Sequence, residues 1–151
     1  MPHVRRQIVA AAKRALSALS TVAAANVHAG RAAPVASTAA PYLLLYAREE
    51  RAESVSSRGQ GDRRLQRVLT LVVEAVTAEA ADSDELIDAI ALEVETALAA
   101  DPTLGDLAKD LVYSGIAIDG KVEGESRTGI ARIEFTILYH TSARAADTPL
   151  Q

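Results

Sequence analysis

The feature that most constrains the fold is the segment IARIEFTILYHT, residues 130–141, which has the strictest alternation of apolar and polar residues in the chain. A period of two is typical of a β-strand with one face buried. The segment from Leu111 to Ile118 is apolar enough to pair with it, which predicts a hairpin with a turn region over 120–129. The residues predicted to face the core are Ile133, Phe135, Ile137 and Tyr139.

A second strand pair is predicted earlier in the chain. Pro41 precedes the run YLLLY, residues 42–46, and a longer strand covers 64–77. One face of the longer strand is apolar, with Leu65, Leu69, Leu71 and Val73. The other face alternates polar residues with three valines and is too apolar for open water, so it predicts contact with a partner subunit. The candidate interface residues on that face are Val68, Val72 and Val76.

Two helices are indicated by apolar residues at three- and four-residue spacing. The first covers 3–19, with Pro2 suited to its first turn. The second follows DSDE at 82–85, where Asp82 or Ser83 is a suitable N-cap, and it ends near Asp101 and Pro102. The sequence TLGDLAKD after it predicts one further helical turn.

This order predicts a single α+β domain over residues 1–151. Its core is a mainly antiparallel sheet of about four or five strands, packed with the N-terminal helix and the central amphipathic helix. Residues 22–40 are Ala-rich and predict a loose connection, in which a short strand near Val27 is compatible with the pattern. The tail, residues 142–151, has no periodicity and is predicted to be disordered.

Composition argues against several classes of function. Cysteine is absent, which removes disulfides, zinc-thiolate sites and thiol catalysis. The three histidines have no second ligand at metal-binding spacing, and no nucleophile or phosphate-binding motif is present. We therefore expect no catalytic, cofactor-binding or metal-binding residues and no enzymatic activity. No apolar run is long enough for a membrane span, and an interrupted apolar start predicts an unexported, soluble chain.

Charge is divided unequally along the chain. Residues 1–67 contain eleven Lys/Arg and four Asp/Glu, a balance of +7, whereas residues 68–151 contain five and sixteen, a balance of −11. Such asymmetry fits a basic region for nucleic acid, or complementary faces of neighbouring subunits. The chain has only four Tyr and one Phe, so few aromatic side chains are available to stack on nucleic-acid bases, which favours the second interpretation.

The segment between the first two strands is unusually charged: ten of the twenty residues from Arg48 to Arg67 are charged. It forms a predicted hairpin arm over 48–64. Its composition fits a solvated, mobile tip and equally fits an arm that becomes ordered against a partner. The candidate subunit or tube contacts are Arg48, Glu49, Glu50, Arg51, Arg58, Arg63, Arg64 and Arg67.

The order of these segments resembles a known family. A short helix leads to APYLLLYAREE, a charged hairpin, LQRVLTLVVEAV, an acidic helix start in DSDELIDAIALEVETAL, the segment DLAKDLVYSGI and a last strand, RIEFTILYHT. Over residues 3–141 this resembles the tail-terminator proteins (minor tail or tail-completion proteins) of long-tailed bacteriophages and related tailed particles. The sequence departs from that pattern in its Ala-rich 22–40 segment and its polar tail.

The resemblance implies a structural virion protein. Family members form a homo-hexameric ring at the head-proximal end of the tail tube, assembled in the bacterial cytoplasm. The ring ends tube polymerisation and presents a docking surface for the neck or head-completion protein, and DNA passes only transiently through its lumen. It implies no cofactor, no catalysis and no membrane partner. The alternatives are another head–tail connector or neck adaptor, and a small nucleic-acid-binding regulatory module.

Overall fold

A computed structural model describes residues 1–18, 27–30, 41–55, 62–78, 83–123 and 126–151. Within these ranges the chain forms two helices and six strands of one mixed sheet. The strand order is β1-β2-β3-β5-β4, and β6 pairs with β5. The elements are α1 (Val4–Ser17), β1 (Val27–Ala29), β2 (Tyr42–Ser54), β3 (Arg64–Ala78), α2 (Ser83–Ala99), β4 (Asp110–Glu123), β5 (Ser126–Ser142) and β6 (Ala145–Pro149).

The predicted α+β class with two helices is confirmed, but the sheet is larger than the four or five strands expected. Antiparallel pairing dominates, and among the described strands only β1 pairs in parallel, with β2. The sixth strand comes from the tail, so the expectation of a disordered tail does not hold. Leu150 N donates to His140 O at 2.9 Å, and Gln7 Nε2 donates to Asp147 O at 2.8 Å. Such bonds to the main chain leave no periodic pattern in the sequence.

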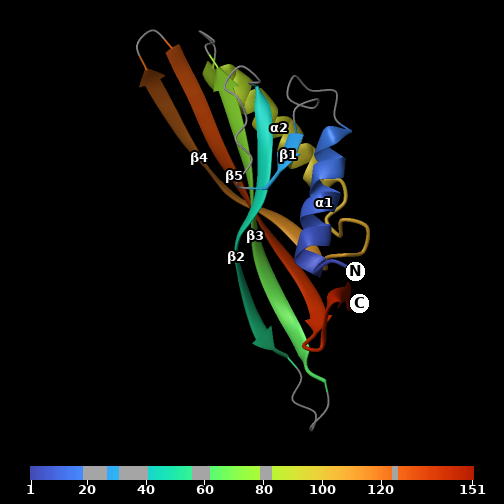
Figure 1. Cartoon of the computed structure of the whole chain (residues 1–151). Helices are drawn as coiled ribbons and strands as arrows, with labels where there is room; N and C mark the ends of the chain where they lie inside the picture. Colours follow the sequence, from blue (N-terminus) through green and yellow to red (C-terminus); the bar gives the residue numbers. More distant parts are fainter. Residues whose placement is uncertain (19–26, 31–40, 56–61, 79–82, 124–125) are drawn as a thin grey trace.

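Both helices pack on the same face of the sheet (Figure 1). In α1, four apolar residues at four-residue spacing are fully buried against it, as the sequence predicts. In β3 and β5, residues at odd positions face the helices and residues at even positions face away. The core is aliphatic around one phenylalanine, and its largest fully buried side chains include Tyr139, Phe135, Ile8, Leu16, Leu98 and Ile137.

Two long strands each contain a bulge that reverses which residues face the helices. In β2 the register shifts between Ala47 and Glu49, so the core-facing positions are odd before the bulge and even after it. Glu50 therefore lies opposite the buried Leu69 and points to the helix side. The same happens in β4 between Tyr113 and Gly115. A simple period of two along either strand is consequently broken.

The hairpins are longer than predicted and their connections shorter. β2 continues to Ser54 and β3 begins at Arg64, so eight of the seventeen residues of the predicted 48–64 arm lie in strands, and this part of the hairpin extends away from the helices (Figure 1). Likewise, β4 continues to Glu123 and β5 begins at Ser126, inside the predicted 120–129 turn region. The sequence did not show how far these strands extend, because their ends are polar. There the backbone hydrogen bonds between strands continue without a buried face.

The predicted extra helical turn after α2 is wrong. Residues 102–107 form turns, in which Leu104, Gly105 and Asp106 all have positive φ angles. The Asp101 carboxylate organises them: it accepts hydrogen bonds from Thr103 Oγ1 at 2.7 Å and Gly105 N at 2.8 Å. These bonds, the Thr103 hydroxyl first, lower the pKa of Asp101. A carboxylate that satisfies backbone donors at a helix end favours a turn over further helix.

Candidate assembly surfaces

A half-buried cluster of charges lies where the arm leaves the body of the protein. The Glu50 side chain is 11% exposed, and its Oε2 accepts from Arg5 Nη1 and from Arg67 Nη1, each at 2.9 Å. Its Oε1 accepts from the Tyr139 hydroxyl. Arg67 also donates to Thr141 Oγ1 at 2.9 Å and lies over the Tyr139 ring. One carboxylate therefore links α1, β2, β3 and β5.

The surroundings of this cluster are set by the N-terminus of α1. The His3 side chain caps the helix, because its Nδ1 accepts from Arg5 N at 3.0 Å. Burial, followed by the nearby Arg5 and Arg67 charges, lowers the pKa of His3. Burial also raises the pKa of Tyr139, and the hydrogen bond to Glu50 adds to this effect. His3 thus lies near the charged trio and Tyr139 contacts it, and the cluster fastens α1 to the root of the arm.

The sheet face away from the helices carries the predicted interface valines. Val72 is 1% exposed and Val76 is 8% exposed, so both are already covered within the chain, and only Val68 is partly exposed. Charged and hydroxyl groups cross this face from strand to strand. Arg48 pairs with Glu134, Tyr46 Oη donates to Glu74 at 3.2 Å, and Arg132 Nη1 donates to Asp119 at 2.8 Å. Their role in subunit contact stays a prediction, and Val72 and Val76 offer little free surface for it.

The predicted arm residues divide between internal and open positions. Arg48, Glu50 and Arg67 are engaged as described above. Arg64 Nη2 contacts His140 Nδ1 at 2.8 Å and donates to Gln151 O at 2.9 Å. Glu49, Arg51 and Arg63 are exposed, and no side-chain hydrogen bond or ion pair holds them within the described ranges. Arg58 lies outside the described residues.

The largest group of exposed apolar side chains in the described ranges lies on β4, at an edge of the sheet. Tyr113, Ile116 and Ile118 lie on the helix side at 42%, 38% and 52% exposure, and Val112 on the opposite side is 53% exposed. Within the described part of the chain, no strand pairs with the outer edge of β4. Edge strands are usually shortened or charged to prevent association, and this one is long and apolar. Sequence reasoning recognised the strand but not the surface, although LVY and IAI are apolar on both faces.

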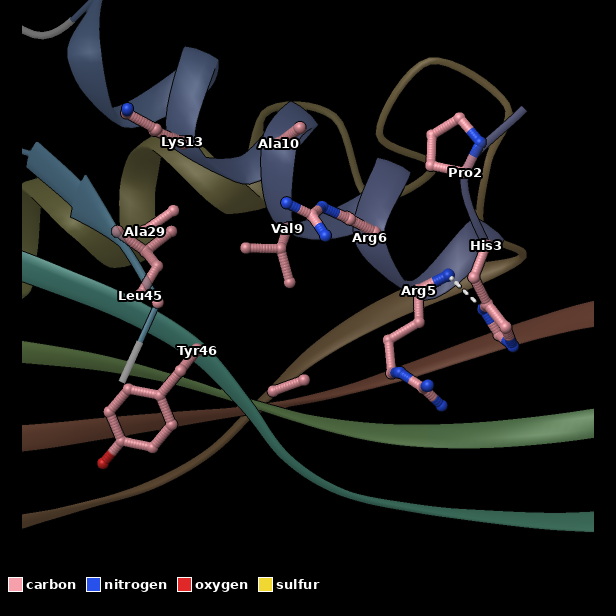
Figure 2. A pocket seen from close by; sticks show the side chains of 12 residues that line it. Pro2, His3, Arg5, Arg6, Val9, Ala10, Lys13, Ala29, Leu45 and Tyr46 are labelled. Carbon is pink, nitrogen blue, oxygen red and sulfur yellow. Dashed lines mark hydrogen bonds between the residues drawn. The ribbon is translucent and has the colours of Figure 1, made fainter. Parts of the chain in front are cut away.

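A hollow of about 860 Å³ opens between α1 and the strands β1 and β2. Figure 2 shows Arg5, Arg6 and Lys13 around it on the helix side, with Leu45 and Tyr46 on the strand side. The helix contributes three cationic side chains, with Val9 and Ala10 between them. The hollow has an apolar floor and a basic rim, which suits an apolar side chain flanked by acidic groups.

No group of three His, Asp or Glu side chains converges as a metal site in the ranges that the structure covers. His3, His28 and His140 lie on α1's N-terminus, β1 and β5, and no metal ligand set includes them there. Neither described helix is long and apolar enough to cross a membrane. No protein-family model matches this chain, and no curated protein matches it in sequence.

Proposed function

We propose that this protein is a structural assembly protein of a tailed phage or phage-derived particle. In this proposal it forms a ring that ends the tail tube at its head-proximal end and docks the neck. The observation that carries the proposal is the β4 edge, where Val112, Tyr113, Ile116 and Ile118 are exposed on a strand with an unpaired outer edge. Such a surface is costly for a free monomer in water and favourable once a protein partner covers it.

The shape of the molecule supports the same function. The β2–β3 hairpin extends beyond the helices as a paired, twisted arm (Figure 1), and the Glu50 cluster holds its root. A fixed arm presents its exposed charges to a partner with little further loss of conformational freedom. Glu49, Arg51 and Arg63 are the described arm residues whose side chains are available for such contacts.

Heterologous contacts that close on themselves make rings. The two edges of this sheet differ: β1 is a three-residue strand beside α1, and β4 is a fourteen-residue strand beside α2. Unlike edges favour head-to-tail contact between copies over a symmetric pairing of identical surfaces. The opposite charge balance of the two halves of the chain adds attraction between unlike faces.

Tail length tests this proposal. Lysates from hosts with this gene deleted and with it restored are compared by negative-stain electron microscopy. Over-long or irregular tubes that revert to uniform length on complementation are the expected result. Tails of normal length that fail to join heads assign the protein to the head–tail connector alternative. Unchanged particles in both lysates rule out the tail function.

A further inference from the structure

The outward side of α1 carries two cations with a small residue between them. Arg6, Ala10 and Lys13 follow one another at spacings of four and three residues, which places them on one stripe of the helix. Arg6 is exposed, and the other two are partly exposed. Neither cationic side chain has a hydrogen bond or ion pair within the described ranges. All three line the hollow at α1 shown in Figure 2.

The outward side of α2 carries the complementary arrangement. Asp88, Leu92 and Glu95 follow the same spacings of four and three residues. Leu92 is 67% exposed, more than any other leucine in the described ranges. The two acids lie on either side of it along the helix. The Asp88 and Glu95 side chains have no hydrogen bond or ion pair in the described part of the chain. An exposed leucine between two unpaired acids is unfavourable in water and suits an apolar seat with a basic rim.

The two stripes match in length as well as in charge. An α-helix rises about 1.5 Å per residue, so seven residues separate each pair of charges by about 10.5 Å on both helices. Within one subunit the residues of both stripes are exposed or partly exposed, and no hydrogen bond or ion pair in the described ranges joins the two stripes. α1 packs against β1 and β2, and α2 packs against β3, β4 and β5. The two helices also contact each other on one face of the sheet, so the stripes lie on neighbouring helices of one layer, with α1 towards the β1 edge and α2 towards the β4 edge.

We propose that α2 of one copy of this chain packs on α1 of the next copy. Leu92 seats beside Ala10 in the hollow, and Asp88 and Glu95 pair with Arg6 and Lys13. The inference rests on the proposed ring and identifies its subunit contact. Three of the exposed β4 residues, Tyr113, Ile116 and Ile118, lie on the α2 side of the sheet, so they border the same contact and become buried with it.

Charge reversal tests the pairing in the full chain. Arg6→Glu/Lys13→Glu and Asp88→Lys/Glu95→Lys each place like charges opposite one another, and Leu92→Arg removes the apolar contact. We expect each variant to raise the concentration at which the assembly half-dissociates by at least ~10-fold, because like charges at a contact are strongly unfavourable. Combining the two reversals restores the attraction, and we expect it to bring the half-dissociation concentration most of the way back to the wild-type value. Particle mass is measured by light scattering and native mass spectrometry.

Controls separate folding and net charge from contact. Lys109→Glu/Arg144→Glu reverses two charges elsewhere, and we expect it to assemble as the parent does. Circular dichroism and urea unfolding of every variant confirm that the monomer still folds. Recovery in the combined variant is itself a folding-independent result, since a merely damaged helix is not repaired by a second pair of substitutions.

Three results overturn the inference. If both charge-reversal variants assemble to the wild-type particle mass, the ring contact lies elsewhere. The proposed function still stands in that case if tail length depends on the gene. Loss of salt-dependent DNA binding in the Arg6/Lys13 variant, with unchanged assembly, assigns the basic stripe to nucleic acid. A monomeric wild-type chain at all concentrations removes both the contact and the ring.

Discussion

The cluster around Glu50 allows one quantitative prediction. Replacing Glu50 with Ala removes the acceptor of Arg5, Arg67 and the Tyr139 hydroxyl. Arg5 is 41% exposed at its side chain, so water can solvate it after the loss. Arg67 is only 12% exposed and is held in place by Thr141. The substitution therefore leaves a largely buried guanidinium without its counter-ion.

Breaking a buried ion pair by removing one partner costs about 3–5 kcal/mol. Because Glu50 and Arg67 both keep some contact with solvent, we expect the lower end, about 3 kcal/mol in the free energy of unfolding. For a chain of this length, that corresponds to a fall in melting temperature of about 6–12 °C. Glu49→Ala is the matched control on the same strand: its side chain is exposed, so we expect a change below about 0.5 kcal/mol.

Urea unfolding at one fixed protein concentration measures the effect for Glu50→Ala, Arg67→Met and the double variant. The double variant removes both charges, so we expect it to be more stable than the sum of the single losses predicts, with a coupling of about 1–3 kcal/mol. If Glu50→Ala costs no more than Glu49→Ala, or if the losses simply add, the cluster does not stabilise the root of the arm.

Three further outcomes follow from the structure. Burial lowers the pKa of His3 and of His140 below 6.5, with additional repulsion from nearby cations, so the unfolded chain binds protons that the folded chain does not. The contribution of these two histidines to the free energy of unfolding is therefore fully present above about pH 6.5 and is lost as the pH falls below it. In His140→Gln, we expect the urea midpoint to depend less steeply on pH between about pH 7 and 5. Ile118→Lys changes the unfolding free energy by less than about 0.5 kcal/mol but reduces assembled mass in light scattering, because this side chain is exposed on β4. Phe135→Ala lowers the unfolding free energy by about 3–5 kcal/mol in the same urea assay, because its side chain is 1% exposed in the core.

The sequence predicted those elements whose apolar residues repeat on one face. Four-residue spacing located α1 and α2, and strict alternation located β5, where Phe135 and Ile137 face the core as expected. Elements held mainly by backbone bonds were harder to predict. β6 has no buried stripe, and its pairing with β5 depends on the main chain of the tail.

The candidate surfaces were less predictable because bulges decide which side chains turn inward. Counting by twos from Leu43 places Glu49 on the core side, whereas the bulge at Arg48 places Glu50 there. Composition cannot locate a bulge, so the charge that joins α1 to the arm was indistinguishable from its neighbours. On β4 the apolar pattern was visible, but its exposure depends on α2 leaving the sheet edge uncovered, which only the packing of the helix determines.

The charge density of the arm has a partly internal cause. Of the described charges between Arg48 and Arg67, several bind other parts of the same chain: Arg48 to Glu134, Glu53 to Gln66, Asp62 to Ser142, Arg64 to His140, and Glu50 to Arg67. A hairpin that projects from the body has little apolar surface to bury, so cross-strand charge pairs and hydrogen bonds hold it in shape. The residues left for the proposed partner are fewer than the composition suggests. Among the described ones, Glu49, Arg51 and Arg63 are exposed and unpaired, so substitutions there test the proposed contact without weakening the fold.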